Sequence, residues 1–93
     1  MPAFNGTYER NIDMNEDLAW EIVRVAFRSS RELQDLLGLL KDRASADEYR
    51  TYSMGIARTM DAVNDSLLNP VIAAHPELAD RIEAELDANG RID

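Results

Sequence analysis

Apolar residues recur at helical spacing along most of the chain and predict two long helices. No proline interrupts residues 14–43, and apolar side chains return there every three or four positions. Over residues 46–68 the apolar spacing alternates between four and three, which is typical of the contact seam between paired helices. We therefore expect helices at about 14–43 and 46–68.

Helix-start signals support both elements. Ser45 is followed three residues later by Glu48, which predicts a capping box at the start of the second helix. For the first helix, Asp13 and Asn15 are both good N-caps, and the sequence does not choose between them. Because only a short connection separates the two long helices, we expect them to pack as antiparallel neighbours.

Two prolines divide the remainder of the chain. Pro70 and Pro76 each disfavour the helical conformation in the residue before them and lack a backbone donor. They predict a short helical turn at 70–75 and a last helix at 76–88, which Gly90 would end in a left-handed conformation.

The overall pattern indicates an all-α protein with one domain. No segment has the two-residue period of a strand, and 93 residues are enough for a single small core. We expect a helical domain over residues 13–93, preceded by an irregular arm at 1–12 that contains turn signals and no helical period.

The first half of the first long helix is unusually apolar, since eight of the ten residues at 18–27 are apolar. A helix that is apolar nearly all round has to be covered on more than one side. We expect part of the side that carries Trp20, Val23 and Phe27 to stay exposed in a monomer and to form the face of a homodimer, in which two hairpins build a four-helix-bundle-like core. Without cysteine, oligomerisation is the remaining way to supplement such a small core.

Charge narrows the classes of partner. The chain has 18 acidic against 10 basic residues and a formal net charge of −8, and the excess lies near the two ends. An acidic chain is a poor ligand for nucleic acid or for an anionic membrane surface, and no stretch approaches the roughly 20 apolar residues of a bilayer-spanning helix. The absence of cysteine and of a secretory signal leads us to expect a cytoplasmic protein.

One segment has the spacing of metal ligands. Residues 85–93 place oxygen-bearing side chains at alternate positions, a glycine at the sixth and an acid at the ninth, and so resemble the first nine positions of an EF-hand loop. The resemblance implies weak calcium binding, because position 12 with its bidentate glutamate is missing. The alternative is a glycine-capped helix end followed by an acidic tail. The candidate ligands are Glu85, Asp87, Asn89 and Asp93.

Two charged strips have a structural and a functional interpretation each. Asp80, Glu83 and Asp87 share one face of the last predicted helix, either as a solubilising surface or as a surface that binds a basic partner or mimics a phosphate backbone. A basic strip on the first helix consists of Arg24, Arg28 and Arg31. Acids at neighbouring helical spacings favour a paired, solvated face there over an anion site.

The sequence contains no constellation of catalytic residues. His75 is its one histidine, cysteine is absent, and no serine-nucleophile motif is present. We therefore expect a non-enzymatic protein–protein interaction or regulatory module, without a cofactor, whose partners are a second copy and an unidentified protein. The alternatives are a weak calcium- or divalent-metal-binding module and an acidic inhibitor that mimics nucleic acid.

Overall fold

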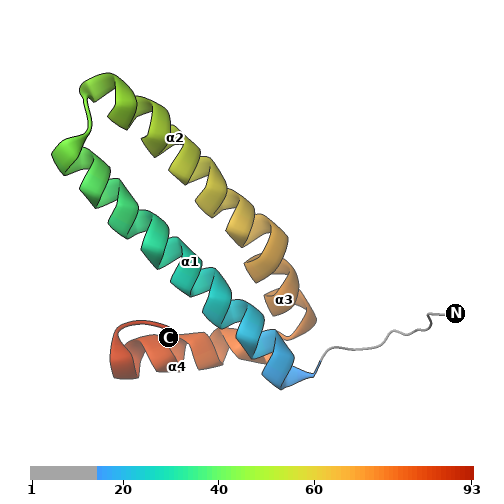
Figure 1. Cartoon of the computed structure of the whole chain (residues 1–93). Coiled ribbons are helices and arrows are strands. Elements are labelled where there is room, and N and C mark those ends of the chain that lie inside the picture. Colours follow the sequence, from blue (N-terminus) through green and yellow to red (C-terminus); the bar gives the residue numbers. More distant parts are fainter. Residues whose placement is uncertain (1–14) are drawn as a thin grey trace, which may run out of the picture.

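The computed structural model describes residues 15–93, and every regular element in this range is helical. The elements are α1 (Glu16–Arg43), α2 (Ala46–Val63), the π-helical segment η1 (Asn64–Leu68), α3 (Asn69–Ala74) and α4 (Glu77–Asn89), as Figure 1 shows. The predicted all-α class is confirmed for this range. The predicted arm at 1–12 lies outside the described residues.

Asn15 is the N-cap of α1. Its side-chain oxygen accepts a hydrogen bond of 2.8 Å from the backbone N–H of Leu18. The choice that the sequence leaves open between Asp13 and Asn15 is thereby decided for Asn15. Acidic residues in the first turn of α1 and basic residues in its last turn further stabilise the helix, because they complement its dipole.

α1 and α2 form the antiparallel hairpin that dominates the molecule (Figure 1). The predicted capping box begins α2. The Ser45 hydroxyl accepts from the backbone N–H of Glu48 at 3.1 Å, and the Glu48 carboxylate accepts from the backbone N–H of Ser45 at 2.8 Å. Two otherwise unpaired backbone donors are satisfied in this way, which fixes where the chain reverses direction.

The capping box predicts a pH-dependent contribution to stability. The backbone N–H and the hydroxyl of Ser45 lower the pKa of Glu48 in the folded protein. A carboxyl group whose folded pKa is depressed stabilises the fold above its unfolded pKa and loses that contribution as pH falls through its folded pKa. In urea titrations, Glu48→Gln should therefore lose less stability than the wild type between neutral and acidic pH. Equal pH profiles for Glu48→Gln and the wild type would contradict this assignment.

Ser45→Ala tests the other half of the capping box. It should lower the free energy of unfolding at neutral pH by about 1 kcal/mol.

The helix continues through Pro70 instead of breaking before it. In place of the predicted interruption between 46–68 and 70–75, the π-helical turn η1 joins α2 to α3, and the backbone N–H of Asn69 bonds to the carbonyl of Asn64 five residues earlier. In an α-helix the proline ring clashes with the carbonyl four residues before it. The wider π turn moves the preceding carbonyls out of α-helical register, so Pro70 is accommodated within a continuous, bent rod.

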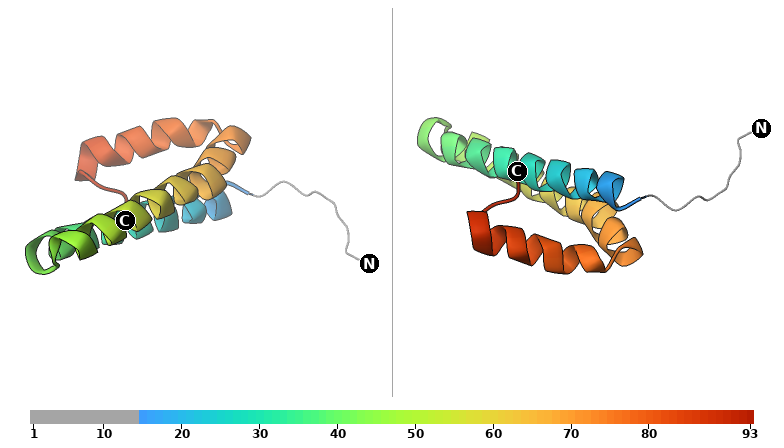
Figure 2. Two further views of the ribbon diagram at one scale, coloured as in Figure 1. Left: turned by 90° about the horizontal axis from the view of Figure 1, so that it is seen from above. Right: turned by 90° about the horizontal axis from the view of Figure 1, so that it is seen from below.

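α4 forms a second layer on one face of the hairpin (Figure 2). It begins after the backbone leaves helical geometry at His75, and it ends at Gly90, whose φ of 77° is left-handed. The Gly90 N–H bonds to the carbonyl of Leu86 at 2.8 Å. From this cap the last three residues, Arg91–Asp93, turn back onto α1. We refer to them as the tail.

The core lies where the first half of α1 meets α3, α4 and the tail. Its fully or almost fully buried members are Ala19, Val23, Val71, Leu78 and Ile92. The tail therefore takes part in the core, because Ile92 is only 1% exposed.

This packing corrects the predicted dimer face. Val23 is 0% exposed within a single chain, so it is not among the residues of this side that stay exposed in a monomer. Trp20 and Phe27 are half-buried against the same core, and the Arg81 guanidinium lies 4.0 Å from the centre of the Trp20 ring. The tail and α4 therefore cover Val23, whereas Trp20 and Phe27 stay partly exposed, and self-association stays a prediction.

Candidate functional site

The predicted calcium ligands lie mainly on a helix. Glu85, Asp87 and Asn89 belong to the last turns of α4, and the Asn89 amide donates to the Glu85 carboxylate at 3.0 Å. Asp93 lies in the tail, with its carboxylate 2.9 Å from Arg91 Nε. Within residues 15–93, no group of three or more His, Cys, Asp or Glu side chains is placed to hold a metal ion. This arrangement matches the glycine-capped alternative, and calcium binding stays a prediction.

The acidic strip Asp80, Glu83 and Asp87 lies exposed on α4. Its neighbour Arg81 connects α4 to the start of α1 through a contact of 3.3 Å with Glu16. Solubilisation and binding of a basic partner are both compatible with this placement, so both stay predictions.

His75 lies at the junction of α3 and α4, outside the pocket described below. Its Nδ1 is 3.2 Å from a carboxylate oxygen of Glu77. The pKa of Glu77 is lowered, mainly by a hydrogen bond from its own backbone N–H. Burial raises this pKa by a smaller amount, and the hydrogen bond and charge of the His75 ring lower it further. The pair stabilises the start of α4, where carboxylates interact favourably with the helix dipole.

The arginines of α1 hold the tail. Arg24 pairs with Glu21 at the predicted helical spacing, and its Nε also donates to the main-chain oxygen of Asp93. Arg31 donates to the main-chain oxygen of Ile92 at 3.0 Å, across 61 residues of sequence. Helical spacing predicts acidic partners for Arg31 on α1 itself, whereas its described contacts are with Ile92 and Asp93 in the tail.

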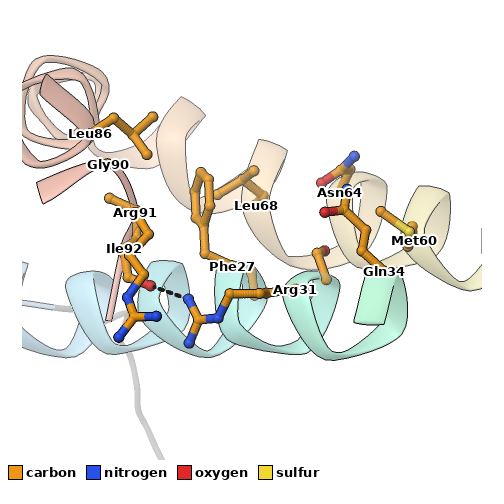
Figure 3. A pocket seen from close by; sticks show the side chains of 12 residues that line it. Phe27, Arg31, Gln34, Met60, Asn64, Leu68, Leu86, Gly90, Arg91 and Ile92 are labelled. Atoms are coloured by element: carbon orange, nitrogen blue, oxygen red, sulfur yellow. Dashed lines mark hydrogen bonds between the residues drawn. The ribbon is translucent and has the colours of Figure 1, made fainter. Parts of the chain in front are cut away.

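A pocket of about 380 Å³ opens between the hairpin, the end of α4 and the tail (Figure 3). Phe27 of α1 and Leu68 of η1 occupy its middle in Figure 3. Arg91 and Ile92 of the tail lie at one end, where the dashed line joins Arg31 to Ile92. At the other end are two amide side chains and a thioether: Gln34, Asn64 and Met60.

Charge in this pocket is opposite in sign to that of the whole chain. The charged side chains that line it are the guanidinium groups of Arg31 and Arg91. The Asp93 carboxylate is not part of the lining, but it lies 2.9 Å from Arg91 Nε and 3.8 Å from Arg31 Nη2. The chain as a whole carries a net charge of −8. The pocket thus combines an apolar middle with a cationic end, an arrangement that orients a ligand having one apolar and one anionic part.

No local sequence pattern indicates this pocket, because its walls come from three distant parts of the chain. Gln34 and Asn64 stand in ordinary helical patterns, and nothing in their surroundings marks them as neighbours. The one local signal is Ile92, an apolar residue that follows the helix-stop Gly90 among polar neighbours.

A second candidate surface lies on the hairpin. Leu18 is 55% exposed, Val25 is 40% exposed and Leu67 is 43% exposed. Ile22, Val25 and Leu67 line a shallow groove together with Glu21. At 100° per residue, Val25 points about 160° away from the buried Val23, so this groove faces away from the core. We call the apolar residues on this side the open face: Leu18, Ile22, Val25, Leu36 and Leu67.

None of the helices within residues 15–93 combines the length and hydrophobicity needed to cross a membrane. The chain matches no protein-family model, no curated protein and no solved structure.

Proposed function

We propose that this protein is a non-enzymatic interaction module that self-associates through the open face of its hairpin and presents its remaining helical surfaces to a protein partner. The observation that carries the proposal is the exposure of Leu18, Val25, Leu36 and Leu67, each between 40 and 55% exposed, on the hairpin.

The energetics favour covering this face. Full burial of one leucine or valine side chain stabilises by roughly 1.5–3 kcal/mol, so covering several half-exposed ones contributes several kcal/mol per protomer. Monomeric proteins rarely keep large contiguous apolar patches exposed. A small domain without disulfides has little stability from its own core, which adds to the advantage of a partner surface.

A second copy fits the shape of the open face. Four of the five residues of the open face lie on α1 and Leu67 lies on η1, and two hairpins placed with these sides together would make a four-helix core. A two-fold dimer uses the same patch on both protomers, so an apolar patch meets an apolar patch. The proposed dimer keeps the four-helix architecture expected from the sequence, and its contact face is the open face in place of Trp20, Val23 and Phe27.

Sedimentation equilibrium tests the proposal. The wild type should show a concentration-dependent shift from the 10.5 kDa chain to twice that mass at micromolar concentrations. Val25→Asp should remain monomeric, because it places a carboxylate in the apolar interface without touching the core.

Met54→Asp is the matched control. Met54 is 51% exposed, and it lies two residues from the buried Ile56 and therefore on the outer side of α2. This variant should dimerise like the wild type. A wild-type protein that stays at 10.5 kDa throughout the concentration range would contradict the proposal.

A further inference from the structure

We propose that the pocket between α1, η1 and the tail binds an amphipathic carboxylate of the medium-chain fatty acid class, with its carboxylate at Arg31 and Arg91 and its alkyl chain over Phe27 and Leu68. This site is separate from the open face, so it can exist whether or not the protein dimerises.

The shape of the pocket suits an elongated ligand. Figure 3 shows the tail at one end, Phe27 and Leu68 in the middle, and Gln34 and Asn64 at the other end. A volume of about 380 Å³ lies within the range of pockets that hold small molecules. A chain that runs from the tail toward the amides would cover the apolar middle and leave its anionic group beside the arginines.

The charge of the lining selects the head group. Guanidinium groups present several N–H donors in a planar fork that matches the geometry of a carboxylate. Arg31 and Arg91 are the charged side chains of this lining, and the overall negative charge of the protein would otherwise favour cations. Discrimination in favour of an acid over an amine of the same length is therefore a property of this pocket and not of the whole surface.

The tail itself already places a carboxylate beside the two arginines. Ile92 is buried, and the Asp93 carboxylate beside it lies 2.9 Å from Arg91 Nε and 3.8 Å from Arg31 Nη2. The Asp93 side chain is 65% exposed, and exposed ion pairs of this kind contribute little to stability. An incoming carboxylate can therefore share or replace the contacts of Asp93 while the main-chain hydrogen bond from Arg31 keeps the tail in place.

Decanoate, below the concentration at which it forms micelles, is the probe. In ¹H–¹⁵N correlation spectra we expect saturable shifts at the Gly90 amide and at the side-chain amides of Gln34 and Asn64. 1-Decanol and decylamine should bind at least about tenfold more weakly, since neither brings an anionic group to the arginines.

Four variants separate the pocket from other sites. Arg31→Gln and Arg91→Gln should each weaken decanoate binding about tenfold, while Arg31→Lys keeps the charge and should lose less. Arg28→Gln is the matched control: Arg28 is exposed on the same helix and does not line the pocket, so its binding should equal that of the wild type.

Asp93→Asn is a variant for which we expect tighter decanoate binding, a result that loss of the fold would not produce. It removes the carboxylate that competes for Arg31 and Arg91 and keeps both main-chain oxygens, so decanoate should bind several-fold more tightly. Absence of saturable shifts at Gly90, equal binding of 1-decanol, or larger shifts at Val25 and Leu67 than in the pocket would each overturn the proposal. Unfolding curves for each glutamine variant show whether a loss of binding reflects loss of the fold, and in that case Arg31→Lys and Asp93→Asn decide the outcome.

Discussion

Ile92→Ala is expected to lower the free energy of unfolding by about 2–4 kcal/mol. Ile92 is 1% exposed and packs with Val23 and Leu78 in the core. Truncation removes apolar contacts and leaves a cavity, because backbone held by Arg24 and Arg31 cannot collapse freely into the space. Urea denaturation followed by circular dichroism measures the effect.

Leu39→Ala is the control for Ile92→Ala. Leu39 is 46% exposed on α1, and its truncation should change the free energy of unfolding by less than about 1 kcal/mol. If both variants lose the same small amount of stability, the tail does not form part of the core. A large decrease in the free energy of unfolding for Ile92→Ala alone would support the packing of Ile92 in the core between α1 and α4.

Val23→Asp is expected to have the largest effect, with a loss of about 4 kcal/mol or more, or no cooperative unfolding at all. Val23 is 0% exposed at the centre of the contact between α1, α4 and the tail. A carboxyl group there would have to be buried without a described partner or would have to separate α4 from the hairpin. Thermal unfolding and near-ultraviolet circular dichroism of Trp20 would record the change.

Val25→Asp is the matched partner of Val23→Asp, since it makes the same substitution two residues farther along the same helix. Val25 is 40% exposed on the open face, so its replacement should leave the unfolding of the monomer nearly unchanged and alter self-association instead. Were Val23→Asp to yield a stable monomer and Val25→Asp to unfold, the sides of α1 would be assigned the wrong way round.

Local signals in the sequence predict the helical elements well, and the reason is their short range. Ser45 and Glu48 are three residues apart, and every atom of the capping box they predict lies within one turn. The start of α1 was ambiguous because Asp13 and Asn15 both have side chains that can cap, and Asn15 makes the bond. At Pro70 the local rule predicts a break, but a π turn moves the clashing carbonyl and the helix continues to Ala74.

The candidate site could not be predicted in the same way. Arg31 has acidic residues at helical spacing on its own helix, and its described partners lie in the tail, 61 residues away at Ile92. Hydrophobicity alone predicts that the 18–27 segment needs cover on several sides, and within one chain the side of Val23 is covered while Leu18 and Val25 stay exposed. It does not say whether α4, the tail or a second copy supplies that cover.

The sequence by itself determines the helical periods, the capping box, the glycine stop at Gly90 and the negative charge, because each depends on residues within one or two turns or on composition alone. Only the tertiary structure decides that α4 and the tail cover Val23, that the open face is left exposed, and that two arginines meet an apolar pocket. These arrangements depend on the backbone conformation at His75 and Gly90, which sets the orientation of α4 and of the tail. The local sequence permits several such orientations, and contacts with distant residues of α1 stabilise one of them.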